Sequence, residues 1–315
     1  MSKILHKLTG VVVCALVALS VPVARADGLQ RFVVFGDSLS DPGNAFVLLK
    51  KLEVPPFPSL IPDAPYARGA LHFSNGPTWV EQLSWVEHAL PSAGPALALP
   101  TVFSNYAVGG ARAGGAGPFD LSGQVNVFLK EFRAKAPDAL YVVWLGGNDV
   151  RDALTAYAGG RPDIATNILS QAVGSIYTNL LTLYQSGARR FLVPNAPDIG
   201  LAPAVRLLGP GAQGLATALA GQFNLALEGV LLSLEATPGV KVVRLDVFTV
   251  LDEIVANPAG ERLTDATDAC IRIDTRTQAF CPRPDQYLFW DGIHPTVAGH
   301  RILARRAQAA LDAAH

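Results

Sequence analysis

A serine, an aspartate and a histidine in this chain have the types and spacing that nucleophilic catalysis requires. Ser38 lies in the segment Gly-Asp-Ser-Leu-Ser-Asp of residues 36–41, and Asp291 and His294 lie in Asp-Gly-Ile-His-Pro near the other end of the 315-residue chain. A serine hydroxyl becomes a useful nucleophile when a base takes its proton. An aspartate three residues before a histidine can bond the imidazole Nδ1 and leave Nε2 for that proton. The three residues predict a serine hydrolase, although each alone also suits a turn or a helix start.

Two further segments supply hydrogen-bond donors rather than titrating groups. Residues 105–111 read Asn-Tyr-Ala-Val-Gly-Gly-Ala, and residues 145–149 read Leu-Gly-Gly-Asn-Asp. A glycine N–H and an asparagine amide can both bond a tetrahedral oxyanion, so both segments suit an oxyanion hole, and both also suit ordinary tight turns. We interpret Asp149 as a cap for the helix that follows, not as a group in proton transfer.

These residues must be positioned by strands and helices that alternate along the chain. Short apolar runs predict buried parallel strands at residues 31–35, 102–106, 140–145, 190–194 and 240–245. Helical periodicity predicts helices at residues 77–89, 122–134, 164–186, 211–234 and 295–314, with Gly187 ending one helix and Pro295 in the first turn of another. Residues 54–69 and 257–284 are expected to be long surface loops. The alternation indicates one α/β domain in which loops after the strands carry the chemistry.

The N-terminal residues indicate export. Lysines near the start, an apolar run over residues 11–23 and Ala-Arg-Ala at residues 24–26 are typical of a signal peptide, so we expect residues 1–26 to be removed and residues 27–315 to form a single domain. Removal changes the formal net charge from -1 to -4, which gives no footprint for nucleic acid. No later apolar run reaches bilayer length. Of three cysteines, Cys270 and Cys281 remain, and an oxidising compartment favours their pairing.

The four motif segments together resemble the GDSL or SGNH hydrolase family, in the order that the family has them. The resemblance implies a nucleophile at Ser38 and an acid and base at Asp291 and His294. It also implies an oxyanion hole formed by the N–H of Ser38, a glycine of residues 105–111 and Asn148. Counting from Asn105 favours Gly110 as that glycine, with Gly109 as the alternative. Residues 73–79 and 287–291 also resemble a branch of secreted bacterial phospholipases, lecithinases and haemolysins. That branch usually has arginine where this chain has His72.

The expected fold is a three-layer α/β/α sandwich with a flavodoxin-like sheet of about five parallel strands, in the order 2-1-3-4-5. The expected function is a secreted esterase or lipase that cleaves carboxylic esters of lipids or short acyl chains, without cofactor or metal. Phospholipase A or lipid acyltransferase activity is the main alternative, and carbohydrate deacetylation or non-catalytic binding are further ones. The expected location is the periplasm or the extracellular space, and the sequence does not predict an oligomeric state.

Overall fold

The computed structural model describes residues 31–49, 71–89, 91–132, 138–271 and 281–314. The predicted signal segment and the proline-rich loop of residues 54–69 lie outside these ranges, as do residues 272–280 of the predicted loop at 257–284.

Four parallel strands form the main sheet, in the order β1-β2-β3-β4. Their bounds are β1 Phe32–Gly36, β2 Leu140–Trp144, β3 Arg190–Pro194 and β4 Lys241–Leu245. The register aligns Phe32 with Leu140 and Leu140 with Arg190, so the strands end at one edge of the sheet. All four match predicted strands, because short apolar runs buried on both faces carry a strong sequence signal.

The fifth predicted strand, at residues 102–106, was wrong as a strand. The segment lies beside β1, where the order 2-1-3-4-5 requires it, and backbone bonds join the two: Val34 donates to the carbonyl of Ser104 and accepts from the N–H of Tyr106. In the described residues these contacts amount to isolated bridges and not to a strand. At the two ends of β1, side chains replace the ladder, because Ser92 Oγ accepts from the N–H of Phe32 at 3.0 Å and Gln124 accepts from the N–H of Gly36 at 2.9 Å.

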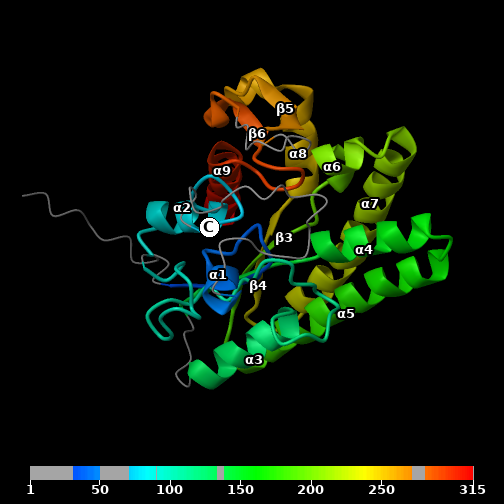
Figure 1. The fold of residues 1–315 in the computed structure, drawn as a ribbon. Helices are drawn as coiled ribbons and strands as arrows, with labels where there is room; N and C mark the ends of the chain where they lie inside the picture. Colours follow the sequence, from blue (N-terminus) through cyan, green and yellow to red (C-terminus); the bar gives the residue numbers. More distant parts are fainter. Residues whose placement is uncertain (1–30, 50–70, 90, 133–137, 272–280, 315) are drawn as a thin grey trace, which may run out of the picture.

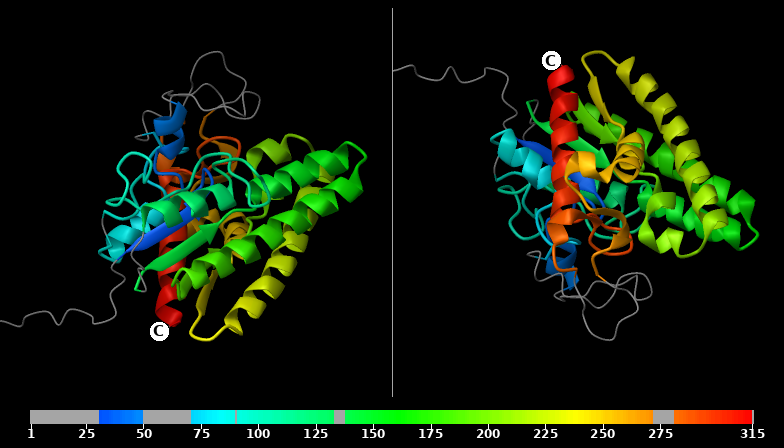
Figure 2. Two further views of the ribbon diagram at one scale, coloured as in Figure 1. Left: turned by 90° about the horizontal axis from the view of Figure 1, so that it is seen from below. Right: turned by 90° about the horizontal axis from the view of Figure 1, so that it is seen from above.

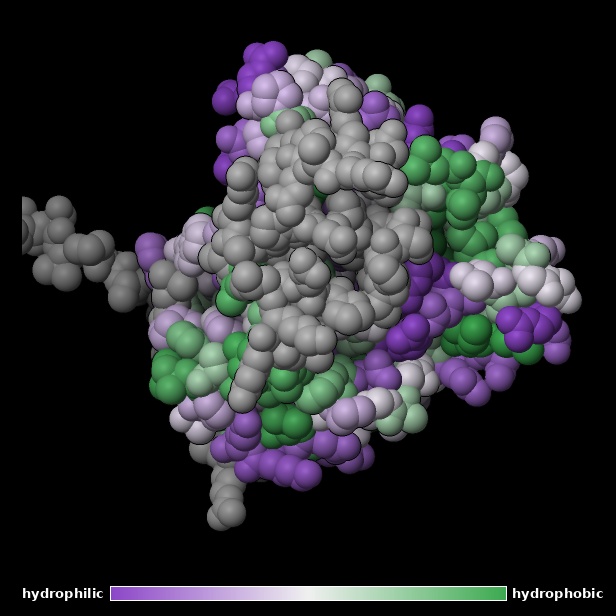
Figure 3. Space-filling view, viewed as in Figure 1, coloured by the Kyte–Doolittle hydropathy of each residue, from purple (hydrophilic) through white to green (hydrophobic). Residues whose placement is uncertain are grey.

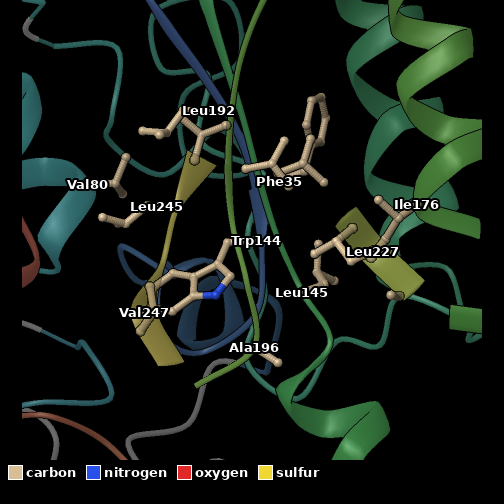
Figure 4. Close-up of a cluster of buried hydrophobic side chains, with 14 of the residues drawn as sticks. Phe35, Val80, Trp144, Leu145, Ile176, Leu192, Ala196, Leu227, Leu245 and Val247 are labelled. Carbon is tan, nitrogen blue, oxygen red and sulfur yellow. The ribbon is translucent and has the colours of Figure 1, made fainter. Parts of the chain in front are cut away.

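Helices cover both faces of the sheet and give the predicted three layers (Figures 1 and 2). One face carries α2 (Trp79–Val86) and α9 (Val297–Ala313), and the other carries α3 (Leu121–Glu131), α5 (Pro162–Gln185) and α7 (Pro210–Glu235). Large side chains from strands and helices meet in a continuous core that includes Phe35, Trp144 and Leu227 (Figure 4). Burial of such side chains drives the packing of the layers.

Most of the predicted helices are present with small shifts at their ends. Gly187 has a φ of 114° and directly follows the C-cap of α5, as predicted. Pro295 was wrongly placed in the first turn of the last helix. Thr296 caps α9 through its hydroxyl, which accepts from the N–H of Gly299, so the helix begins two residues later than expected.

A helix after residue 149 was expected without bounds, and it is α4 (Gly147–Ala158). Several other elements were not predicted: α1 (Asn44–Leu49), α6 (Pro203–Arg206), α8 (Val247–Ala256), the 3-10 turns η2 (Ile199–Leu201), η3 (Pro258–Glu261) and η4 (Pro284–Gln286), and the small parallel pair of β5 (Asp265–Ala269) with β6 (Tyr287–Phe289). The pair shows that residues 257–284 are not wholly loop, as we had expected. Since β6 leads directly to Trp290 and Asp291, this second sheet supports one of the motif segments.

Among the described residues, α7 is the one helix long and apolar enough to cross a bilayer by length and composition. A third of its apolar window is buried, and helices of protein cores pass the same test. The prediction that no span follows the signal segment stays a prediction.

Candidate active site

Ser38 lies in a tight turn at the carboxyl end of β1. The turn is closed by the N–H of Ser40, which donates to the carbonyl of Asp37 at 3.1 Å, and by the N–H of Leu39, which donates to the Asp37 carboxylate at 3.0 Å. A Cβ on Gly36 would lie 3.0 Å from that of Ser40, so the turn needs a small residue there. The side chain of Ser38 is thus held at the sheet edge where parallel α/β folds collect their reactive groups.

The structure brings Ser38, His294 and Asp291 into one hydrogen-bonded row, across 256 positions of sequence. His294 Nε2 lies 2.8 Å from the Ser38 hydroxyl, and His294 Nδ1 lies 2.7 Å from Asp291 Oδ2. The other carboxylate oxygen of Asp291 accepts from the backbone N–H groups of Ile293 and His294. The three side chains are buried, so water competes little for these bonds. The arrangement can remove a proton from the hydroxyl when an electrophile arrives.

The segment of residues 73–75 holds the loop that carries His294. The ring of Phe73 packs against the imidazole with centroids 5.3 Å apart, and the Ser74 hydroxyl donates to the carbonyl of Pro295 at 2.8 Å. Asn75 accepts from the N–H of Val297 at 2.7 Å. The segment that resembles the phospholipase branch therefore restricts where the imidazole can lie.

His72, which stands where that branch has arginine, lies 2.8 Å from a carboxylate oxygen of Glu81 in α2. Glu81 also accepts from the N–H and the hydroxyl of Thr78 and so caps the same helix. Both His72 and Glu81 are largely buried. His72 therefore helps to anchor α2 through Glu81.

The carboxylate of Asp41 distinguishes the two candidate oxyanion glycines. The N–H of Gly109 donates to Asp41 Oδ2 at 2.8 Å, so that amide is already engaged. Gly110, with a φ of 81°, makes no such bond among the described residues, whereas both glycines line a second cavity of about 270 Å³, which does not distinguish them. The N–H of Gly109 is therefore engaged within the protein, and the choice of Gly110 as the oxyanion donor stays a prediction.

Asn148 lies in the first turn of α4 and lines the same cavity as Ser38 and His294. One hydrogen of its side-chain amide is donated to the carbonyl of Ala111 at 2.9 Å, which fixes the orientation of the amide. An amide nitrogen carries two hydrogens, so one is left for a ligand.

The interpretation of Asp149 as a helix cap was wrong. Gly146, with a φ of 128°, occupies the N-cap of α4, and Asp149 lies inside the first turn. Its carboxylate accepts from the N–H groups of Ala113 and Gly114 at 2.8 and 2.9 Å, and so joins α4 to the loop that follows Gly110. The local sequence does not distinguish an aspartate that bonds a distant loop from one that caps a helix.

Asp41 is a second residue that sequence reasoning missed. Its carboxylate is fully buried and accepts from four backbone N–H groups, those of Gly43, Asn44, Ala45 and Gly109. It lies in the same six-residue motif as Ser38, which was the signal that could have identified it. Burial raises the pKa of Asp41 to about 6, and burial likewise raises the pKa of Asp37 and of Asp149 to about 6.

The cavity at Ser38 has a volume of about 550 Å³, within the size range of small-molecule sites. Away from Ser38, its lining is mostly aliphatic side chains from α4, α7, α8, α9 and the region of α6: Leu154, Ala202, Val205, Leu208, Leu215, Val247, Val250, Leu251, Ile254 and Leu303. An apolar chain attached to an electrophilic carbonyl fits such a lining.

Cys270 and Cys281 are joined by a disulfide, as predicted. Next to it, the N–H of Cys270 donates to the carbonyl of Phe289 and the N–H of Ile271 to that of Trp290, both at 2.9 Å. The disulfide is therefore attached to the strand that leads into Asp291. Within the described ranges, no group of three or more His, Cys, Asp or Glu side chains is arranged to hold a metal ion.

Comparison with known proteins agrees with this site. The family model described as GDSL-like Lipase/Acylhydrolase matches residues 32–307. A GDSL esterase/lipase of Arabidopsis thaliana is 28% identical over 321 residues, which cover 87% of this chain and 83% of the relative. A phosphatidylcholine-sterol acyltransferase of Aeromonas hydrophila is 26% identical over 352 residues, which cover 94% and 95% of the two chains.

Among solved structures, the chain is similar to LAE5, described as an alpha/beta hydrolase enzyme from the metagenome of Lake Arreo, Spain. The TM-score is 0.50 at 13% identity, and the match covers 91% of this chain and 96% of the other. This likeness supports the fold. The predicted family, fold class and enzyme class are thereby confirmed: the chain belongs to the GDSL-like lipase/acylhydrolase family and is a carboxylic ester hydrolase.

Proposed function

We propose that the chain hydrolyses carboxylic esters through an acyl-enzyme formed on Ser38. The observation that carries the proposal is the row from the Ser38 hydroxyl through His294 to Asp291, with contacts of 2.8 and 2.7 Å. The Ser38 oxygen attacks the ester carbonyl carbon while His294 Nε2 takes the hydroxyl proton. His294 then gives that proton to the departing alkoxide, and the acyl group stays on Ser38. Water repeats the sequence on the acyl-enzyme and releases the acid.

The negative oxygen of each tetrahedral intermediate is held by the N–H groups of Ser38 and Gly110 and by the amide of Asn148. The bonds of Gly109 to Asp41 and of Asn148 to Ala111 support this assignment, because they fix the loop and the amide before substrate arrives. Donors that are already oriented need no rearrangement when charge develops, which is the basis of their effect on rate.

The substrate is an ester with an apolar acyl chain. The mainly aliphatic lining of the 550 Å³ cavity supports this class over carbohydrate deacetylation, because most of that lining offers no hydrogen-bond partner to a sugar hydroxyl. A second candidate is transfer of a phospholipid acyl chain to an alcohol. The Aeromonas relative, a phosphatidylcholine-sterol acyltransferase matched along almost its full length, favours it. The two differ only in whether water or an alcohol attacks the acyl-enzyme.

The chain acts outside the cytoplasm after removal of residues 1–26, as one domain over residues 27–315. The disulfide between Cys270 and Cys281 supports an oxidising compartment. The family match, which spans residues 32–307 without a break, supports a single domain.

The test is turnover of soluble aryl esters of increasing acyl length by the mature chain and three variants. Ser38→Ala and His294→Ala should lose activity to a similar residual level because the two groups act as a unit. Asn148→Ala should lose about a hundredfold in kcat. A serine-reactive phosphonate should label Ser38 in the wild type. The matched control is Ser40→Ala, two residues away, which should still be labelled; full activity of Ser38→Ala would disprove the mechanism.

A further inference from the structure

Two adjacent leucines between α6 and α7 are largely exposed. Leu207 is 76% exposed and Leu208 is 66% exposed. We call these two residues the leucine corner. Figure 3 shows hydrophobic residues gathered over α6 and the adjacent start of α7. Single exposed leucines need no explanation, but an adjacent pair on a tight turn exposes a continuous apolar surface.

The leucine corner is part of the rim of the cavity at Ser38. Leu208 lines that cavity although most of its side chain is exposed, so the apolar surface continues from outside the molecule into the site. The helix that precedes the corner, α6, is also bonded to the loop of residues 291–294: the N–H of Ala204 donates to the carbonyl of Gly292 at 2.9 Å. Gly292 lies between Asp291 and His294. An acyl chain that passes Leu208 therefore enters the cavity at Ser38 directly.

The charge pattern around the corner fits a lipid surface. Residues 207–222, which comprise the corner and the first half of α7, contain no charged side chain, whereas the exposed Arg206 directly precedes Leu207. Segments that bind at a lipid–water interface combine apolar side chains, which enter the acyl region, with cations, which contact the headgroups. A soluble helix face normally carries charges on its outer side, and the first half of α7 does not.

The corner is too small to be a stable interface with a second protein. Such interfaces bury roughly 800 Å² per partner, whereas even an aromatic side chain covers only about 150–250 Å². Insertion of a few apolar side chains is sufficient for a peripheral contact with lipid.

We infer that the leucine corner docks on the surface of a lipid aggregate or bilayer and lets an ester pass along Leu208 to Ser38. The inference rests on the proposed function and adds its partner, a lipid–water interface. Leu207, which does not line the cavity, makes the contact with lipid, and Leu208 continues that contact into the acyl site.

The experiment compares Leu207→Ser with Leu225→Ser, a matched control. Leu225 is 78% exposed on α7, about four turns from the start of that helix. Two rates are measured for each variant, one on a water-soluble short-chain aryl ester and one on a long-chain ester held in phosphatidylcholine vesicles. Binding is measured separately in the Ser38→Ala background, by sedimentation with vesicles of phosphatidylcholine with and without phosphatidylglycerol.

Leu207→Ser should lower vesicle binding and the vesicle rate by about tenfold or more, because a polar side chain replaces the apolar one that enters the lipid. Its rate on the soluble ester should stay within about twofold, and Leu225→Ser should change neither rate beyond that range.

Equal losses on the two substrates, unchanged vesicle binding, or the same loss in Leu225→Ser would overturn the inference. So would a wild-type dimer that Leu207→Ser dissociates in ultracentrifugation, because the corner would then bind a second copy. Failure of the proposed function is recognised separately: the wild type would not cleave the soluble ester, or Ser38→Ala would still cleave it.

Discussion

Substitution of Asp41 tests how the loop that contains Gly109 and Gly110 is held in place. Asp41→Asn keeps the size of the side chain but replaces one acceptor oxygen with an NH₂ donor. If the amide keeps its oxygen toward Gly43 and Asn44, the N–H groups of Ala45 and Gly109 lose their acceptor. A buried N–H without a partner costs about 1–3 kcal/mol, so the unfolding free energy should fall by about 2–6 kcal/mol. Loss of a buried charge offsets part of this cost, because burial raises the pKa of Asp41 to about 6.

The same change should release Gly109 and displace the N–H of Gly110. Loss of one oxyanion donor costs on the order of 10²–10³ in kcat, with little effect on KM because the donor acts on charge that develops in the transition state. The assay is kcat and KM on a soluble aryl ester, corrected for the folded fraction from urea unfolding. Asp246→Asn is the control, since Asp246 caps α8 by accepting from Thr249 and lies away from the motif loops.

Two results would contradict this reasoning. One is a folded Asp41→Asn variant with kcat within about threefold of the wild type, because a displaced donor costs far more than that. The other is a fall in kcat no larger than the fall in folded fraction, which would show a structural role alone.

Three further predictions concern stability and the imidazole site. Burial lowers the pKa of His300 to about 3, so between about pH 6.5 and 3 the unfolded chain binds a proton that the folded chain does not. The unfolding free energy should therefore fall by up to about 1.4 kcal/mol for each unit by which the pH is lowered in that window. In His300→Asn, the unfolding free energy measured with urea should depend less steeply on pH across the same window. Cys281→Ser opens a loop with a sequence separation of 11 residues and should lower the unfolding free energy by about 3 kcal/mol, which reduction of the wild type should reproduce. A Cβ at Gly109 would lie 2.2 Å from Phe73, so Gly109→Ala should lower kcat by up to about a hundredfold, whereas Gly214→Ala, with open space around it, should leave kcat unchanged.

The sequence was sufficient to predict the parts of the fold that depend on local patterns. Buried strands such as Phe32–Gly36 and Arg190–Pro194 appear as short apolar runs, and Gly187 ends a helix by its own conformational freedom. The segment at residues 102–106 has the same pattern but is not a strand. Its contacts with β1 stay isolated bridges because Ser92 and Gln124, which lie elsewhere in the sequence, accept from the N–H groups at the two ends of that strand.

The candidate site shows the same division. Ser38 and His294 were found because a nucleophile and its base need particular residue types, and those types occur within recognisable motifs. Asp41 and Asp149 were missed or misassigned because an aspartate that accepts backbone N–H bonds from a distant loop looks in sequence like one that caps a helix. The bond that engages the N–H of Gly109 likewise comes from another loop.

The positions of Asp291 and His294 determine when, during synthesis of the chain, the catalytic residues are all present. The serine comes from the first strand, whereas its partners come after most of the sheet and immediately before α9. On the proposed roles, a ribosome-bound chain that ends before residue 291 holds an alcohol with no base and cannot cleave esters. Reactivity toward the cell's own lipids would then begin only after translation is nearly finished and the two ends have docked.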